Sequence, residues 1–278
     1  MVKRIIKPAD KMRRFLSILL IFSLLFASTS FIPPVQPRII HVLVALCDND
    51  SQGIVPVPRA IGNGNDPDQN LYWGCGYGVR TFFKKSAEWK CISSVKDPKT
   101  HVMERLIFKH NSQNCILVAD AYRGARIKQC TQDFFKNASG NFSEQVSFSH
   151  NKVTTAIELG DANLVAYVGH DGLMDFSLDG QYPSRKKDLS INKDVMIYAC
   201  ISKTYFYDGV LKSGANPVVW TTGLMCPEAY TLKASIDGWL LGETNLQIKE
   251  RNAQAYNTYQ KCGINGARGL FYAGWKNK

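Results

Sequence analysis

The 278-residue sequence lacks several patterns that would assign a chain to a class directly. It contains no Cys-x-x-Cys pair, which excludes a zinc ribbon and a thioredoxin-like redox motif. It also has no internal repeat and, after residue 38, no low-complexity linker that would separate domains. We therefore expect one domain covering residues 39–278.

A concentrated basic surface is also missing. The chain carries 34 Lys and Arg against 23 Asp and Glu, a net charge of +11. Beyond the N-terminus the densest basic run is Arg185 to Lys187, which lies in a polar connection without the interleaved aromatic residues of a nucleic-acid site. We expect a solvated loop there and no nucleic-acid partner. No pattern indicates a metal or an organic cofactor.

The first thirty residues differ in character from the rest. Met1 to Arg14 holds six Lys/Arg and one acid, the apolar run Phe15 to Ala27 follows, and small residues come next. This order is typical of a secretory signal peptide, and the apolar run is shorter than the roughly 20 residues that span a membrane. We expect a signal peptide at 1–30, an extended spacer at 31–38, and export to the periplasm or the cell exterior. The alternative is a membrane anchor formed by an uncleaved N-terminal segment.

All eight cysteines follow that segment and lie largely in apolar stretches. An even number permits disulfides in an oxidising compartment, but a buried free thiol suits an apolar stretch equally well. If Cys200 is a free thiol, seven cysteines remain and at least one more is unpaired. Disulfides are therefore not expected to define the fold.

Short apolar runs alternate with segments of helical spacing along the rest of the chain. Continuous apolar runs bounded by turn residues are typical of strands covered on both faces. The alternation predicts an α/β fold in three layers, a mostly parallel sheet flanked by helices on both faces. The predicted strands are 39–47, 102–109, 115–121, 164–168, 195–199 and 217–221; the predicted helices are 71–85, 123–136, 202–212, 227–241 and 245–262, the last with Asn245 as its cap, and 137–149 is a polar loop.

Two predicted strands end in residues that can carry chemistry. One ends at His170 and the next at Cys200, with 29 residues between them, enough for a crossover between parallel neighbours. Ligands bind beyond the carboxyl ends of such strands, so we expect the imidazole and the thiol to share one edge of the sheet. A histidine there can accept the thiol proton and later protonate a leaving amine. The backbone amides of Cys200 and of the Asp171-Gly172 pair are the expected oxyanion donors.

These segments resemble the caspase-like clan of cysteine peptidases, which includes caspases, legumains, gingipains and clostripain. The matching pieces are 163–172, a strand ending in Val-Gly-His-Asp-Gly, and 194–200, a strand ending in Tyr-Ala-Cys; the order of elements from 39 to about 223 is also similar. The resemblance implies a caspase-like domain, a cysteine endopeptidase with His170 and Cys200 as its catalytic dyad, oxyanion donors at Gly172 and Cys200, and a polypeptide substrate. Asp171 departs from the clan, which usually has glycine directly after the histidine.

The resemblance also implies where a specificity pocket lies. In the clan its residues follow the first strand, precede the nucleophile and follow the next strand. An acid at the pocket floor would favour Arg or Lys before the cut, although aspartate at a strand end is equally expected in a turn. The corresponding residues here are Asp48, Asp50, Tyr198, Thr221 and Thr222, with Trp220 beside the last two.

Two other functions are compatible with the same sequence. The inserted Asp171 suits a catalytically inactive caspase-like binding module, and the dyad alone suits another thiol enzyme, an amidase or acyltransferase. Asp171 and Asp175 are interpreted as turn residues, with orientation of His170 as the alternative role.

Overall fold

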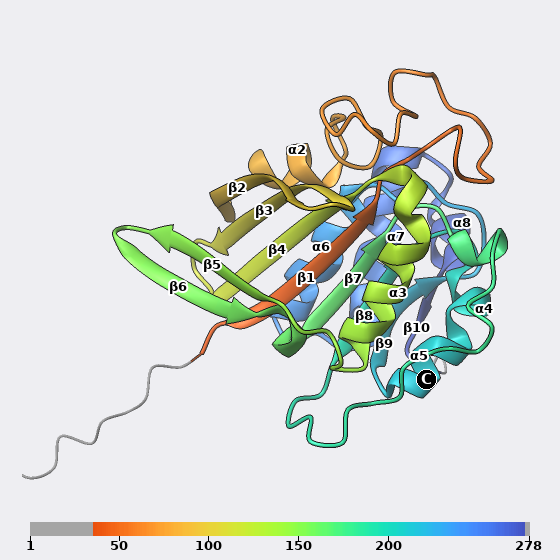
Figure 1. Ribbon diagram of the computed structural model, residues 1–278. Coiled ribbons are helices and arrows are strands. Elements are labelled where there is room, and N and C mark those ends of the chain that lie inside the picture. The colour runs from red at the N-terminus through yellow and green to blue at the C-terminus, as the bar shows by residue number, and fades with distance from the viewer. Residues whose placement is uncertain (1–35, 276–278) are drawn as a thin grey trace, which may run out of the picture. The chain divides into compact units, whose positions relative to one another are not determined.

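The computed structural model describes residues 36–275, and the chain from Pro37 onward belongs to one compact unit (Figure 1). The predicted signal peptide at 1–30 lies outside the described residues. An eight-stranded sheet has the order β10-β9-β8-β7-β1-β4-β3-β2, and its central strands β9, β8, β7, β1 and β4 run parallel. These strands are β1 (Arg38–Ala45), β2 (Trp89–Lys99), β3 (Val102–His110), β4 (Cys115–Tyr122), β7 (Leu164–Val168), β8 (Asp194–Tyr198), β9 (Asn216–Thr221) and β10 (Phe271–Ala273).

Helices cover both faces of the sheet, which confirms the predicted fold class. Along β1, Val42 belongs to the core cluster that includes Ile236 of α6 (Ala229–Leu240), whereas its neighbour Leu43 belongs to the cluster that includes Phe134 of α3 (Ile127–Ala138). Two-sided burial explains why the strand is apolar at successive positions. The helices are α2 (Val79–Lys84), α3 (Ile127–Ala138), α4 (Ser202–Tyr205), α5 (Tyr207–Ser213), α6 (Ala229–Leu240), α7 (Asn245–Gln260) and α8 (Ile264–Leu270).

The structure corrects several predicted elements. The predicted polar loop at 137–149 includes β5 (Gln145–His150), which forms a hairpin with β6 (Val153–Glu158) beside the main sheet (Figure 1). The hairpin has few apolar residues, but those it has, such as Phe148, pack into the core cluster that includes Phe134 of α3. Antiparallel β2 was not predicted, because its sequence is largely polar and carries Asp97 and Pro98.

Two helix starts also differ from prediction. The predicted helix 71–85 is helical only over α2, because the backbone before it folds back on itself; a Cβ on Gly78 would lie 2.4 Å from the Trp73 backbone. The N-cap of α7 is Thr244 rather than Asn245. The Thr244 side chain accepts a hydrogen bond from the Gln247 amide, in a capping box.

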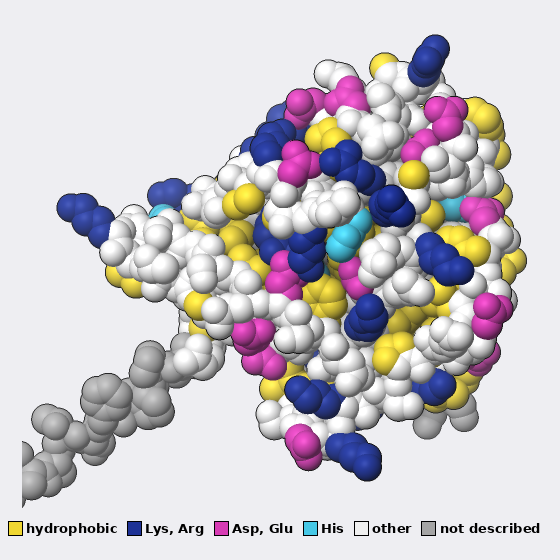
Figure 2. Space-filling view, in the orientation of Figure 1, with side chains coloured by type: hydrophobic (Ala, Val, Ile, Leu, Met, Phe, Trp, Pro, Cys, Tyr) yellow, Lys and Arg dark blue, Asp and Glu magenta, His cyan; other side chains and the backbone are white. Residues whose placement is uncertain are grey.

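Within residues 36–275 no helix is both long enough and apolar enough to cross a bilayer. All eight cysteines of the chain are free thiols in the structure. On the face shown in Figure 2, basic side chains are dispersed among acidic and neutral ones and do not form one continuous patch.

Gly169, between β7 and His170, supports a conformation that other residues rarely adopt. Its φ is +148°, its amide donates to the Tyr198 carbonyl, and an added Cβ would lie 2.8 Å from the Ala45 carbonyl oxygen. We expect Gly169→Ala to lower the free energy of unfolding by about 2 kcal/mol, measured by urea denaturation. Gly266→Ala is the control, because its Cβ would enter open space. Equal effects of the two substitutions would contradict this account.

Candidate active site

The register of β7 and β8 places His170 and Cys200 at the same edge of the sheet. The two strands are adjacent and parallel, and Val168 pairs with Tyr198. His170 and Cys200 each follow their paired residue by two positions. Because the strands point the same way, both side chains emerge where the two strands end, as the sequence predicted.

A carboxylate orients the His170 ring. His170 is 8% exposed, and its Nε2 lies 2.7 Å from Asp175 Oδ2. The same carboxylate oxygen accepts the Gly53 amide at 2.9 Å, which holds Asp175 against the loop after β1. Because Nε2 faces Asp175, any other partner of the ring would have to meet Nδ1. Asp175 therefore has the alternative role named for it, since its carboxylate contacts the His170 ring.

The backbone around His170 is also restrained. The Tyr167 hydroxyl donates to the His170 carbonyl at 2.8 Å, and the Gly172 amide donates to the same oxygen at 3.1 Å. Gly172 is tightly enclosed, since an added Cβ would lie 2.6 Å from the Phe176 ring. The Gly172 amide is therefore committed to His170 in this structure, and it would have to turn away to serve as an oxyanion donor.

The Cys200 thiol is partly buried against the segment after β9. Its Sγ lies 3.4 Å from the Met225 amide nitrogen and 3.6 Å from the Met225 carbonyl oxygen. Burial raises the pKa of the Cys200 thiol; the Met225 backbone hydrogen bond opposes this, and the Asp171 carboxylate adds to it. A thiol of raised pKa needs a base to become a nucleophile, and His170 is the imidazole at the same edge of the sheet.

A strained turn presents Cys200. Ile201, the next residue, has φ +49° and ψ +29°, the left-handed conformation that a β-branched residue rarely adopts. Its amide donates to the Gly223 carbonyl at 2.9 Å. Such strain persists only where surrounding contacts impose it, and it is concentrated at functional sites. Residue 201 is not a glycine, the residue that usually adopts this conformation, so nothing in the sequence indicated the strained turn.

Two buried hydroxyl groups brace that turn. The Thr221 hydroxyl donates to the Ala199 carbonyl and accepts the Ser202 amide at 3.1 Å, while the Ser202 hydroxyl donates to the Ile197 carbonyl at 3.1 Å. The Thr221 amide in turn donates to the Ser202 hydroxyl at 3.0 Å. Thr221 is 0% exposed, so these hydrogen bonds are buried beneath the turn that follows Cys200.

The other residues of the predicted specificity pocket are not gathered around one surface. Tyr198 is buried in the core, where its hydroxyl donates to Ser235 Oγ at 2.6 Å. Asp48 is buried at the end of β1, and its carboxylate accepts the Asp50 amide at 3.0 Å. Asp50 and Thr222 are exposed. Asp48, Tyr198 and Thr221 lie away from solvent and cannot line an open pocket in this structure. An acidic specificity pocket near β1 therefore stays a prediction for Asp50 alone.

Asp171 is the most unusual group at this edge. It is 0% exposed; its Oδ1 accepts the Leu173 amide at 3.0 Å, and its Oδ2 has no hydrogen-bond partner among the described residues. Burial raises the pKa of Asp171 from 3.8 to about 7; the Leu173 amide opposes the shift and the charge of Asp175 adds to it. Asp171 is thus a buried acid whose pKa lies near neutrality, and its charge raises the pKa of the Cys200 thiol.

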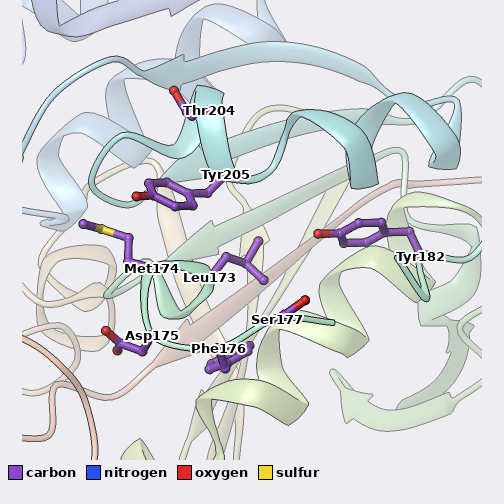
Figure 3. A pocket seen from close by; sticks show the side chains of 8 residues that line it. All are labelled: Leu173, Met174, Asp175, Phe176, Ser177, Tyr182, Thr204 and Tyr205. Atoms are coloured by element: carbon purple, nitrogen blue, oxygen red, sulfur yellow. The ribbon is translucent and has the colours of Figure 1, made fainter. Parts of the chain in front are cut away.

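Within residues 36–275 no group of three or more His, Cys, Asp and Glu side chains is arranged to hold a metal ion. A hollow of about 360 Å³ lies beside the site, between the segment after His170 and α4 after Cys200 (Figure 3).

Comparison with known proteins adds no assignment. No protein-family model matches the chain, and neither the curated proteins nor the solved structures include a match. The case for a function therefore depends on the residues and geometry of this site.

Proposed function

We propose that this protein is an exported cysteine peptidase in which Cys200 is the nucleophile, His170 the general acid and base, and Asp175 the group that orients His170. The observation that supports this most strongly is the in-register pairing of β7 and β8, which delivers the imidazole and the thiol to one edge. The 2.7 Å contact between His170 and Asp175 supports it further. The proposed kinship with the caspase-like clan adds the order of strands and the positions of both residues.

The geometry supports an ordinary acyl-transfer sequence. His170 takes the proton from Cys200 Sγ, and the thiolate attacks the carbonyl carbon of the scissile peptide bond. His170 then donates that proton to the amine nitrogen as the C–N bond breaks, leaving a thioester on Cys200. Water, deprotonated by His170, attacks the thioester, and Cys200 leaves as thiolate and regains its proton. Asp175 keeps the ring oriented and stabilises the imidazolium form.

One observation favours the inactive binding module as a second candidate. The Gly172 amide donates to the His170 carbonyl, so one of the two expected oxyanion donors is engaged. An oxyanion held by a single donor would be stabilised less, and removing one donor from such a site typically costs about 10²- to 10³-fold in rate. Substrate binding that rotates the Gly172 peptide would restore the donor.

Active-site labelling separates these possibilities. We expect a peptide carrying a thiol-directed electrophile to label the full chain at Cys200, mapped by peptide mass spectrometry, because His170 activates that thiol selectively. Cys200→Ser should abolish labelling. Cys226→Ser is the matched control, since Cys226 is a more exposed thiol that lies next to Met225 in sequence, and it should leave labelling intact.

Two outcomes would reject the peptidase. One is labelling that persists in Cys200→Ser. The other is labelling distributed over the exposed thiols of Cys226 and Cys262 with no preference for Cys200, which would show that no base activates it. Turnover of a small thioester or amide without cleavage of any peptide would instead indicate the amidase or acyltransferase alternative.

A further inference from the structure

The segment after β9 carries a second thiol next to the proposed nucleophile. Residues 222–228 connect β9 to α6 and contain neither helix nor strand. Cys200 Sγ contacts this segment through Met225, whose amide nitrogen lies at 3.4 Å and whose carbonyl oxygen lies at 3.6 Å. The next residue in the chain is Cys226, which is exposed. The chain itself therefore brings Cys226 close to Cys200.

Peptide geometry limits how far apart the two cysteines can be. Because a trans peptide unit is planar, the Cys226 Cα lies about 2.8 Å from the Met225 carbonyl oxygen. That oxygen is 3.6 Å from Cys200 Sγ, so the Cys226 Cα lies within about 6.4 Å of this sulfur. In a disulfide one sulfur lies about 4 Å from the partner Cα, so a shift of about 2 Å in a segment without regular structure would join the two sulfurs.

The two thiols also act on each other electrostatically. Burial raises the pKa of the Cys226 thiol, and the charge of Cys200 adds to the rise. The pKa of the buried Tyr72 hydroxyl is raised mainly by burial and further, among other charges, by those of Cys200 and Cys226. Charges interact over short distances in a partly buried site, which agrees with the separation set by the peptide geometry.

Two other cysteines nearby are less suitable partners for Cys200. Cys47, at the end of β1, is 0% exposed, and burial raises its pKa to about 11, so it is neither accessible to an oxidant nor readily ionised. Cys262 is exposed, and its charge acts on Tyr256, whose hydroxyl accepts the Cys226 amide at 3.1 Å. Cys262 is therefore a competitor for Cys226 and not for Cys200.

We propose that Cys200 and Cys226 form a reversible disulfide that switches the nucleophile off. The pairing itself depends only on the two thiols, whereas its effect on activity rests on the proposed peptidase function. While the disulfide is present, Cys200 has no thiol that can attack a carbonyl carbon. The predicted export would bring the pair into an oxidising compartment, where such bonds persist.

The oxidant in this reaction is a small-molecule disulfide. The thiolate of exposed Cys226 attacks one sulfur of that molecule, so a mixed S–S bond forms, the original S–S bond breaks, and one small thiolate leaves. The Cys200 thiolate, whose proton has passed to solvent, then attacks Cys226 Sγ and expels the second small thiolate. The small disulfide gains two electrons and becomes two thiols, and the two protein thiols lose those electrons and their protons. A reducing dithiol reverses both steps.

Peptide mapping in a defined redox buffer tests the pairing. The full chain is incubated at pH 8 with about a tenfold excess of reduced over oxidised glutathione, in which mixed disulfides are minor and thiols held close together pair. It is then blocked with N-ethylmaleimide and digested with trypsin without reduction. We expect a disulfide between the peptides 194–203 and 213–233, which dithiothreitol separates. Absence of this linked pair, or a disulfide that joins Cys226 to Cys262 instead, overturns the proposal.

Labelling of Cys200 by the electrophilic peptide measures the effect on the nucleophile. After the same incubation and removal of glutathione in acid, labelling of the native chain should fall about tenfold and return with dithiothreitol. Cys226→Ser should keep its labelling. Cys262→Ser removes another exposed thiol and is the matched control, so its labelling should fall as in the native chain.

The two measurements separate this proposal from the peptidase function. Labelling of the native chain that does not change in the redox buffer overturns the switch, even if Cys226→Ser fails to fold. If the linked peptides form but the reduced chain is never labelled at Cys200, the pairing stands and the peptidase function fails. If the reduced chain is labelled and no linked peptides form, the peptidase function stands and the switch fails.

Discussion

Replacing His170 with alanine is expected to lower kcat/KM for a peptide substrate by about 10²- to 10⁴-fold, the usual contribution of a general acid and base. The thiol of Cys200 has a raised pKa because it is buried, so without His170 little thiolate forms at neutral pH. The leaving amine also loses its proton donor. The measurement is steady-state cleavage of a fluorogenic peptide, together with the rate of Cys200 labelling.

Two further variants show whether the loss arises from the proposed chemistry. Asp175→Asn keeps the shape of the side chain but removes the charge that faces His170 Nε2, and it should reduce kcat more than KM. His150→Ala, on the β5–β6 hairpin outside the main sheet, is the matched control and should leave both constants unchanged. Full activity in His170→Ala would remove the imidazole from the mechanism.

Replacing Asp171 with asparagine is expected to change the pH dependence of stability by several kcal/mol. Burial raises the pKa of the folded-state carboxyl from 3.8 to about 7, so the folded chain holds a proton that the unfolded chain releases. The stabilisation from this proton is complete below pH 4, declines as the pH rises to about 7, and is absent above it. The decline is on the order of 4 kcal/mol, and Asp171→Asn should abolish it.

Urea unfolding at pH 4 to 8 measures this effect. The difference in free energy of unfolding between Asp171→Asn and the native chain should move in favour of the variant by on the order of 4 kcal/mol as the pH rises from 4 to 8. Asp179→Asn, an exposed side chain on the same connection, is the control and should leave the profile unchanged. A difference that does not vary with pH would show that Asp171 is ionised throughout this range.

The same substitution should alter the nucleophile. The Asp171 carboxylate raises the pKa of Cys200, so its removal should lower that pKa and speed alkylation of Cys200 at pH 8. The native chain should therefore gain less reactivity between pH 7 and 8 than the variant does. Equal alkylation rates over this interval would mean that the two groups do not interact.

Local sequence features predicted six of the eight strands of the main sheet, including the two that end near His170 and Cys200, but not β2 and β10. Continuous apolar runs such as Leu164–Val168 are typical of strands covered on both faces, and the structure places β7 over those five residues. His170 and Cys200 could be selected because each lies one or two positions after such a run.

The roles of the surrounding residues could not be read from the sequence. A strand covered on both faces shows no alternation of polar and apolar residues, so the burial of Tyr198 and Thr221 beneath the turn was not visible. Asp175 lies in an irregular segment where aspartate usually indicates a turn. Only the fold brings its carboxylate between His170 and the Gly53 amide, which is 122 positions away in the chain.

The sequence by itself determined that a buried strand ends at His170 and another at Cys200, because hydrophobic burial and chain direction are local properties. The tertiary structure alone decided that these strands are neighbours in register, that Asp175 orients the imidazole, and that Asp171 is buried without a full set of partners. Those facts depend on which distant segments share one low-dielectric space, since contact and desolvation are properties of the folded chain as a whole.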